Sequence, residues 1–461
     1  MQPPTESTSY NKKPPKPRSV YITTYGCQMN VRDSQIILGV LRKQGYEQAD
    51  CLEKADIILF NTCSVRQHAE ERVWGKAGML ERLKTQNLKS KVIGIIGCMA
   101  QNYQDEIFRR LPHINLVCGP SNIYDIPDLL KKIISENTQV MAVNRRKRPL
   151  LTDCQPDGEA LKAYVSIMYG CNNYCSYCIV PYVRGRESSR PLRHILNEVK
   201  NLASHNFKEI TLLGQNVNSY GKDLNGKIDF IRLLENLDKI AGIERIRFIT
   251  SHPKDVSKEL FRAMKELPKV CEHLHLPLQS GSDKILRLMN RKYTLRDYLK
   301  LIDDLRRLIP ECSLTTDIIV GFPGESEADF QRTYQAMERI QFDEAFIFKY
   351  SPRPKTKAAE LEDDVPLEIK RYRNQKLLAL QERISLKKNK ALLGRSLEIL
   401  AEGVGSYFAG RFRKDALKGR TRTNKVTLFS GKRELISQMV DVKITRALTH
   451  TLIGEINGKK T

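Results

Sequence analysis

Three segments between residues 18 and 135 share one pattern, in which an apolar run ends at a cysteine and an amphipathic helical stretch follows. The runs are SVYITTYGC, ADIILFNTC and KVIGIIGC, and they end at Cys27, Cys63 and Cys98. A shorter run, NLVCGP, looks like a further strand. Strands that alternate with helices predict a parallel sheet, and the strands of such a sheet all end at one edge. We therefore expect the three cysteines to lie together at that edge.

A second series of alternating strands and helices begins near residue 160 and continues to about residue 365. Its predicted strands are LKAYVSIMYG, EITLLGQN, ERIRFITS, EHLHLPL, LTTDIIVGF and EAFIFKY. Helical patterns such as PLRHILNEVKNLASH and YLKLIDDLRRLIP separate them. Six strands suit a partial (β/α)6 barrel better than a closed eightfold one. The site of such a barrel lies at the carboxyl ends of its strands, where the loop after MYG is expected.

The last part of the chain differs from both α/β segments. Residues 366–390 predict a basic helix with Leu377, Leu380 and Ile384 on its apolar face. Short runs such as RSLEILAEGV, KVTLFS and MVDVKITRA then predict a small all-β barrel. The predicted fold class is α/β with a small all-β C-terminal domain. The predicted parts are a disordered leader (1–17), an N-terminal domain (18–135), a linker (136–156), a core that includes the basic helix (157–390) and the β-barrel (391–458).

The charge of the chain points to a polyanionic partner. Its 77 Lys and Arg exceed its 53 Asp and Glu, for a net charge of +24, and after residue 390 there are 14 basic against 6 acidic residues. Nucleic acid is the first candidate for such an excess, and a generally basic surface is the alternative. Candidate phosphate ligands in this part are Arg411, Arg413, Lys414, Lys418, Arg420 and Arg422, with Tyr407, Phe408 and Phe412 between them.

Cysteine usage and the absence of targeting signals indicate a cytoplasmic protein without a membrane segment. The N-terminus lacks an apolar signal region, and no stretch reaches the ~18 apolar residues that a membrane helix needs. In a reducing compartment, clustered cysteines are more often metal or redox ligands than disulfides. Of the 11 cysteines, the five outside the clusters described here are interpreted as core or surface residues: Cys51, Cys118, Cys154, Cys271 and Cys312.

Cys171, Cys175 and Cys178 form a CxxxCxxC motif. Three thiolates at this spacing can bind three of the four irons of a cubane cluster within one loop. The fourth iron is then open to the amino and carboxylate groups of a methionine moiety, as S-adenosylmethionine provides for radical formation. A zinc site is the alternative, but zinc needs four closed ligands, and the sequence offers no second pair nearby.

The segment MYGCNNYCSYCIVPYVRGRESSRP resembles the methylthiotransferase branch of the radical S-adenosylmethionine superfamily. The upstream motifs GCQMN, NTCSVR and GCMAQ match the N-terminal domain of that branch in sequence and in order. The C-terminal β segment resembles a TRAM domain, an RNA-binding barrel. The resemblance implies that Cys27, Cys63 and Cys98 bind a second, auxiliary 4Fe–4S cluster. It further implies two molecules of S-adenosylmethionine per turnover, one as methyl donor and one as radical source.

Within this branch, LLGQNVNSYG resembles the group that acts on adenosine beside the tRNA anticodon once it bears a dimethylallyl group. The expected activity is insertion of a methylthio group at C2 of this base in the anticodon stem-loop. Alternatives are a threonylcarbamoyl-adenosine substrate, a ribosomal-protein side chain, or a non-enzymatic iron–sulfur redox sensor that binds RNA. The expected partners are an electron donor such as flavodoxin or ferredoxin and a carrier of sulfur or of clusters.

Several polar residues are candidates for contacts with cofactor or substrate. Tyr177 is a candidate neighbour of the cofactor adenine, or else a packing aromatic. Gln215, Gln279 and Asp317 are candidate cofactor ligands. Asn216 and Asn218 are candidate ligands of the substrate base, and the alternative for these amides is a role in turn formation.

Overall fold

The structure of the protein is a computed structural model that describes residues 18–65, 67–83, 91–144, 161–226, 228–405 and 416–457. The predicted leader, residues 145–156 of the predicted linker, and Arg411, Arg413 and Lys414 lie outside these residues. The chain divides into two compact units, Met1–Arg146 and Lys147–Thr461. Within the described residues, no helix is long and apolar enough to span a bilayer.

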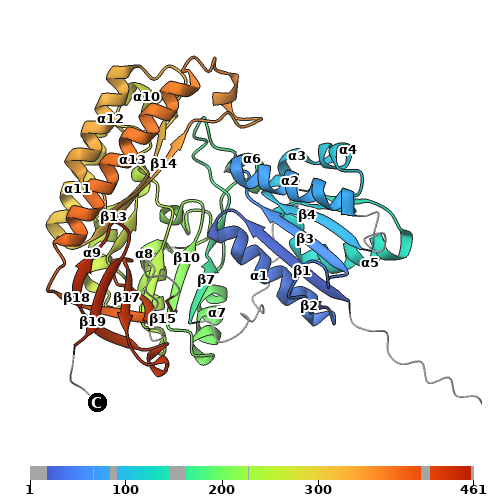
Figure 1. Ribbon diagram of the computed structural model, residues 1–461, viewed down its shortest axis with the longest axis horizontal. Helices are drawn as coiled ribbons and strands as arrows, with labels where there is room; N and C mark the ends of the chain where they lie inside the picture. The colour runs from blue at the N-terminus through green and yellow to red at the C-terminus, as the bar shows by residue number, and fades with distance from the viewer. Residues whose placement is uncertain are drawn as a thin grey trace, which may run out of the picture. The chain divides into compact units, whose positions relative to one another are not determined.

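The described part of the first unit is built on a six-stranded sheet in the order β2-β1-β3-β4-β5-β6, in which all neighbours are parallel (Figure 1). Strands β3 and β4 are buried along their whole length, as expected for central strands that are covered on both faces. The strands are β1 (Ser19–Tyr25), β2 (Glu47–Gln48), β3 (Ile57–Thr62), β4 (Val92–Gly97), β5 (Leu116–Cys118) and β6 (Val140–Ala142). The helices are α1 (Gln28–Lys43), α2 (Gln67–Leu83), α3 (Cys98–Tyr103), α4 (Asp105–Arg110), η1 (Pro120–Asp125) and α5 (Ile126–Glu136).

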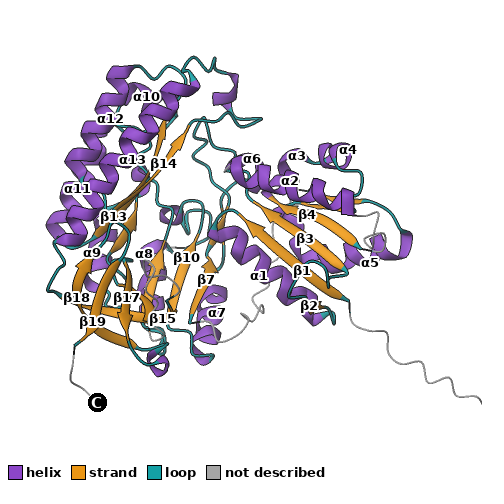
Figure 2. Ribbon diagram, in the orientation of Figure 1, coloured by secondary structure: helices purple, strands orange, loops and turns teal. Residues whose placement is uncertain are grey.

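The second unit contains two three-stranded parallel sheets, β11-β10-β7 and β12-β13-β14 (Figure 2). A parallel bridge between Ile246 and Val270 connects β11 to the segment that leads into β12, so the six strands form a partial barrel. The strands are β7 (Lys162–Ser166), β10 (Glu209–Leu213), β11 (Arg245–Phe248), β12 (His273–His275), β13 (Ser313–Val320) and β14 (Glu344–Lys349). The longer helices are α7 (Leu192–Ser204), α8 (Phe230–Asp238), α9 (Lys258–Glu266), α11 (Leu295–Leu308), α12 (Glu327–Ile340) and α13 (Leu367–Lys390).

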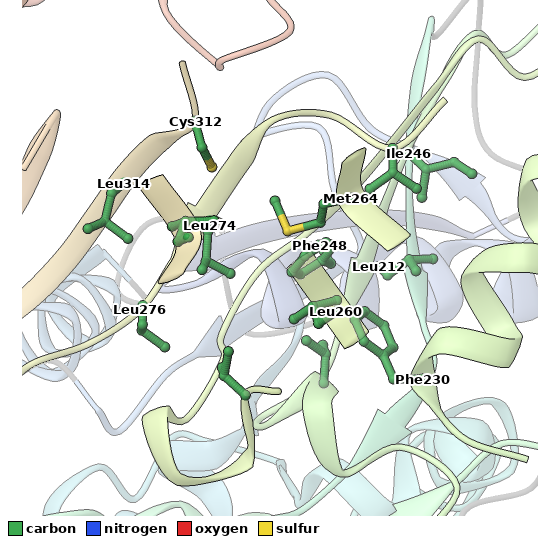
Figure 3. Packing of buried hydrophobic residues seen from close by; sticks show 14 of the residues in the cluster. Leu212, Phe230, Ile246, Phe248, Leu260, Met264, Leu274, Leu276, Cys312 and Leu314 are labelled. Atoms are coloured by element: carbon green, nitrogen blue, oxygen red, sulfur yellow. The ribbon is translucent and has the colours of Figure 1, made fainter. Parts of the chain in front are cut away.

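One hydrophobic core joins the two sheets of this unit to the surrounding helices (Figure 3). In this core Phe248 of β11 packs edge-on against Phe230 of α8, with ring centroids 5.1 Å apart. Leu377, Leu380 and Ile384 of α13 are buried in the same core, which confirms the apolar face predicted for the basic helix. Shorter elements carry loops at the barrel rim: β8 (Met168–Tyr169), α6 (Val180–Arg184), β9 (Ser188–Ser189), η2 (Val217–Ser219), η3 (Pro253–Asp255), α10 (Asp283–Leu288) and η4 (Lys357–Glu360).

The C-terminal part is a closed barrel in the order β15-β16-β17-β19-β18. Its strands are β15 (Ser396–Val404), β16 (Ala416–Thr421), β17 (Val426–Ser430), β18 (Met439–Ala447) and β19 (Leu452–Ile456), with a turn of 3-10 helix, η5 (Arg433–Leu435). The predicted fold class is therefore confirmed in all three parts. The short strands β2, β6 and β9 were not predicted, because two or three residues are too few to show an alternating pattern. The predicted strand LKAYVSIMYG is divided into β7 and β8.

The closed barrel packs on the amino-terminal ends of the partial-barrel strands through charged side chains. We refer to four of the ion pairs between the described residues of the two barrels as the ionic joint. They are Lys162–Glu402, Arg245–Glu398, Arg422–Glu272 and Lys425–Asp343, with N···O distances of 2.7, 2.7, 2.8 and 2.9 Å. Arg245 is fully buried and also donates to the backbone oxygen of Arg420. The joint lies at the opposite ends of the strands from the expected reaction site.

Removal of the positive charge of Arg247, a buried residue next to the ionic joint, is expected to destabilise the second unit. Arg247 forms a buried ion pair with Glu209 at 2.9 Å and donates to the backbone oxygens of Thr421 and Arg422. Arg247→Met leaves the Glu209 carboxylate buried without a counter-charge, which typically costs about 3–5 kcal/mol. Urea unfolding followed by far-UV circular dichroism measures this loss.

Trp74, the single tryptophan, belongs to the first unit, and its fluorescence transition is expected to stay unchanged in this variant. The matched control is Arg232→Met, which removes an exposed pair with Glu235 and should change stability by no more than about 0.5 kcal/mol. Equal losses in the two variants would contradict the assigned role of the buried pair.

Candidate active site

The first three cysteines follow three adjacent strands of the first unit. Tyr25 of β1 pairs in register with Thr62 of β3, and Thr62 pairs with Gly97 of β4. The chain reaches Cys27, Cys63 and Cys98 within two residues of these positions. Cys27 lies at the start of α1, and Cys98 is the first residue of α3. The three residues are thus brought to one edge of the sheet, as predicted from the repeated pattern.

Glycines and buried amides shape this edge. Gly26 and Gly97 have φ angles of +140° and +86°, and a side chain at either position would collide with its neighbours: Cys63 for Gly26, Asn61 for Gly97. Asn30 and Asn61 are buried and hydrogen-bonded to each other at 3.0 Å. The Cys27 thiol donates to the Asn30 side-chain oxygen at 3.2 Å. Close approach of the strands and a fixed amide network therefore hold the thiols in place.

The surroundings of Cys63 make an ionised thiol costly there. A hydrogen bond with Cys27, burial, and the proximity of Cys27 and Cys98 raise the pKa of the Cys63 thiol well above its usual value. Thiolates crowded in this way need positive charge to coexist. Bound iron supplies such charge, because thiolates are the ligands that hold iron–sulfur clusters. The donor set of this edge thus fits a cluster.

The second triplet lies on the loop between β8 and α6, beyond the carboxyl end of β7. Cys171 and Cys175 are buried, and Cys178 is half-buried. The loop is hydrogen-bonded to the end of α10, where Ser176 Oγ donates to the Leu288 backbone oxygen at 2.7 Å. Burial raises the pKa of Cys171 to about 11 and that of Cys178 to about 12. This triplet, too, needs positive charge before all its thiols ionise.

The arrangement of the donors is relevant to the zinc alternative. Within the described residues, no group of three or more His, Cys, Asp or Glu side chains is closed around a point where a metal ion would sit. This finding applies to zinc and to iron alike, so the choice between them rests on the number and kind of donors. Each triplet supplies three thiols of one kind, without the fourth ligand that closes a structural zinc site. Three thiols suit a cubane cluster with one open iron.

Three families match successive parts of the chain. They are the Uncharacterized protein family UPF0004 at residues 19–119, the Radical SAM superfamily at residues 165–337 and the TRAM domain at residues 390–456. The tRNA-2-methylthio-N(6)-dimethylallyladenosine synthase of Caldicellulosiruptor saccharolyticus is 48% identical over 98% of this chain and 95% of that protein. The protein of the same name from Thermoanaerobacter sp. is 49% identical over 95% of this chain and 92% of that protein. The chain belongs to the radical S-adenosylmethionine methylthiotransferase family.

Solved structures agree with this membership at the level of the fold. One is the radical S-adenosylmethionine methyltransferase TsrM from Kitasatospora setae. The match spans 74% of this chain and 75% of TsrM, with a TM-score of 0.55 and 14% identity. Another is the cobalamin-dependent S-adenosylmethionine radical enzyme OxsB. The match spans 80% of this chain and 56% of OxsB, with a TM-score of 0.51 and 13% identity. The predicted family is confirmed, and membership of the superfamily implies a 4Fe–4S cluster and S-adenosylmethionine as cofactors.

In this methylthiotransferase, two of the candidate cofactor residues support the cysteine loop. The Gln215 side-chain oxygen accepts a hydrogen bond from the backbone N–H of Gly170, the residue before Cys171. Tyr177 packs edge-on against Phe322 with ring centroids 6.5 Å apart. Both residues thus lie at the motif, and their contact with the cofactor stays a prediction.

Gln279 is the candidate with an unsatisfied buried group. Its backbone has a φ angle of +71°, which is rare for a residue with a side chain. Its backbone N–H and oxygen bond to Asp317 and Ile319 of β13. The side-chain oxygen is buried and has no hydrogen-bond partner among the described residues. A strained backbone and an unsatisfied amide together are typical of a ligand site.

Asp317 lies on β13 and is partly exposed. It is opposite Phe346 of β14 in register, and its carboxylate is 3.4 Å from Nε2 of His275 on β12. The His275 ring stands edge-on to Phe346, with centroids 6.1 Å apart. The sequence indicated Asp317 alone. His275 and Phe346 were missed, although both occupy alternate positions of predicted strands, which is the signal for a shared face.

The two candidate asparagines differ in their surroundings. Asn216 is buried and makes both of its side-chain hydrogen bonds within the protein, to Asp255 and to the backbone of His252. These bonds fix Asn216 in the loop after β10, and its contact with the substrate base stays a prediction. Asn218 lies in η2, and its buried side-chain oxygen has no partner among the described residues.

The candidate phosphate ligands of the C-terminal barrel lie in two places, the exposed surface and the ionic joint. Lys418 is exposed on β16. Arg420 lies 3.6 Å from Glu402 and also contacts Asn424, whereas Arg422 pairs with Glu272 in the ionic joint. Arg411 and Arg413 are outside the described residues. Sequence reasoning treated all of them as one patch, because the acidic partners are 18 or more residues away along the chain.

Burial of His252 near the rim predicts loss of stability at low pH. Burial and the charges of Arg291 and Lys254 lower the pKa of His252 from 6.5 to about 2. Below pH 6.5, the unfolded chain takes up a proton at this position and the folded chain does not, so stability falls by about 1.4 kcal/mol per pH unit. The His252→Gln variant should lose about 2 kcal/mol less than the unmodified protein between pH 7 and pH 5.

Urea unfolding at a series of pH values measures this difference. His450→Gln is the matched control, because His450 is exposed in the same unit. A His252 variant with the same pH dependence as the His450 variant would show that His252 does not remain neutral in the fold.

Proposed function

We propose that the chain is a tRNA-modifying enzyme that inserts a methylthio group at C2 of N6-dimethylallyladenosine next to the anticodon. The observation that carries this proposal is the presence of two cysteine triplets, each at the carboxyl-terminal edge of its own parallel sheet. The synthases named for this product are similar over nearly the whole chain, which supports the choice of substrate. The reaction replaces an unreactive C–H bond, which acid–base catalysis does not activate.

Cys171, Cys175 and Cys178 would hold one 4Fe–4S cluster, and Cys27, Cys63 and Cys98 would hold a second. When bound, such clusters supply one-electron reduction of a sulfonium and a place for transferable sulfur. Two molecules of S-adenosylmethionine per turnover would serve as radical source and as methyl donor. Gln279 and Asp317 are proposed to bind the cofactor, with Gln215 and Tyr177 shaping the loop beside it. The unpartnered oxygen of Asn218 is proposed to contact the substrate base.

The C-terminal barrel is proposed to bind the stem-loop backbone. Exposed Lys418, together with Arg411 and Arg413, would neutralise phosphates, whereas Arg420 and Arg422 also maintain the contact between the two barrels. We propose a cytoplasmic location, an electron donor such as flavodoxin or ferredoxin, and a carrier that restores sulfur. The predicted limits 18–135, 157–390 and 391–458 remain our proposal for the functional domains.

Removal of one cysteine from each triplet should separate the two halves of the reaction. Cys171→Ala should abolish formation of 5′-deoxyadenosine, because the open-iron site for S-adenosylmethionine is lost. Cys63→Ala should leave this cleavage largely intact and should abolish the methylthio product. Chromatography with mass spectrometry measures both products, and anaerobic reconstitution should give about eight irons in the unmodified chain and about four in each variant.

The matched controls are Cys312→Ala and Cys118→Ala, which change buried cysteines outside the triplets and should keep both products. Methylthio product from Cys63→Ala would contradict the assignment of a sulfur source to the first unit. Four irons in the unmodified chain, or zinc in place of iron, would contradict the two-cluster proposal.

The nucleosides of a strain without this protein test the substrate. We expect loss of the 2-methylthio group from dimethylallyladenosine in tRNA, and its return when the gene is restored. Digested tRNA and ribosomal proteins from the same cells should be compared by mass spectrometry. Loss from threonylcarbamoyl-adenosine alone, or from a ribosomal protein alone, would replace our choice of substrate. An unchanged profile would favour the redox-sensor alternative.

A further inference from the structure

Arg291 is a buried cation that points at the CxxxCxxC loop. It follows α10 and is only 4% exposed. Its Nη1 donates to the Sγ atom of Cys175 at 3.3 Å. Its Nη2 donates to the Pro277 backbone oxygen at 3.0 Å, and its Nε donates to the hydroxyl of Tyr293 at 3.0 Å. Each nitrogen of the guanidinium therefore has a fixed partner.

The partners of Arg291 differ from those of four other buried arginines in this unit. Arg245, Arg247, Arg373 and Arg190 pair with Glu398, Glu209, Glu325 and Glu198, respectively. Arg291, by contrast, has no Asp or Glu within ion-pair distance among the described residues. The groups that favour its charged form are Tyr293, Tyr177 and Cys175. A buried charge without a counter-charge is costly by several kcal/mol, so a stable fold needs an anion beside it.

The cysteine loop is the place where that anion can form. Cys175 is the thiol in contact with the guanidinium, and Cys171 and Cys178 lie on the same loop. We propose that Arg291 is the internal counter-charge of the CxxxCxxC site, and that its hydrogen bond to Cys175 Sγ favours the reduced form of the cluster held there. This inference rests on the proposed cluster at these cysteines. Arg291 acts through Cys175 and is therefore a positioning residue.

The positive charge of Arg291 is expected to make the cluster easier to reduce. Reduction adds one negative charge to the cluster, and a nearby cation and N–H···S hydrogen bonds stabilise that charge; reduction potentials of such clusters depend on both. Little water screens the interaction, because the guanidinium is buried. Loss of Arg291 should therefore make the cluster harder to reduce.

Tyr293 holds the guanidinium in its orientation. Its hydroxyl accepts from Arg291 Nε and donates to the backbone oxygen of Leu278 at 2.8 Å, and its ring lies 5.2 Å from the guanidinium carbon. Tyr293→Phe removes one hydrogen bond and keeps the charge. It should therefore have the same effect as loss of Arg291, but a smaller one.

The test is a redox titration of the reconstituted full-length chain, followed by electron paramagnetic resonance without S-adenosylmethionine. The background carries Cys27→Ala, Cys63→Ala and Cys98→Ala, so that one cluster gives the signal. In Arg291→Gln, the ratio of reduced to oxidised cluster at a fixed potential should fall at least tenfold, which is a shift of about 59 mV to lower potential. Arg291→Lys restores the charge and should recover part of the shift. Arg245→Gln, which removes a buried arginine at the ionic joint, is the matched control and should leave the potential unchanged.

Two outcomes would overturn the inference. One is an unchanged potential in Arg291→Gln, including the case in which the variant only weakens binding of S-adenosylmethionine. The other is an equal shift in Arg291→Gln and Arg245→Gln, which would indicate a general effect of lost stability. If Arg291→Gln retains no iron, Tyr293→Phe decides: a lower potential supports the inference, and an unchanged one overturns it. Failure of the parent chain to assemble any cluster would instead contradict the proposed function.

Discussion

Parallel hydrogen bonding between strands is the constraint on which both cysteine sites depend. Because neighbouring strands of β1, β3 and β4 run in the same direction and pair in register, residues separated by more than 30 positions arrive at one edge. The partial barrel uses the same rule, and its cysteine loop follows β7 and β8 at the rim. Glycine at positions 26 and 97 permits the close approach that an ordinary side chain would block.

The second unit separates its chemistry from its structural charges. Arginines that hold the closed barrel lie at the amino ends of the strands and face glutamates. Arg291 lies near the other ends and faces a thiol. Arginine therefore has two roles in this fold. Beside a carboxylate it stabilises packing, and beside a thiol it favours negative charge on sulfur. Net charge alone does not distinguish these uses.

Much of this arrangement could be predicted from the sequence, since it depends on short-range patterns. Strand and helix periodicity predicted the sheets, and the cysteine at the end of each run predicted the shared edge. Contacts between segments that are distant in the sequence could not be predicted from it. The pairing of Arg422 with Glu272 spans 150 residues, and no local signal marks it. The His275, Asp317 and Phe346 group needed the register of three strands, and the contact of Arg291 with Cys175 needed the fold of the rim.

The ionic joint has a geometric consequence for any RNA that the protein handles. The closed barrel is fixed at the amino ends of the strands, whereas the cysteine loop lies beyond their carboxyl ends. The longest strand, β13, has eight residues, which corresponds to about 26 Å at ~3.3 Å per residue. An RNA that touches the closed barrel and also places a base at the rim must therefore reach from one end of the strands to the other. A substrate that binds at both ends of the strands is elongated, and a free nucleoside is too short to reach both.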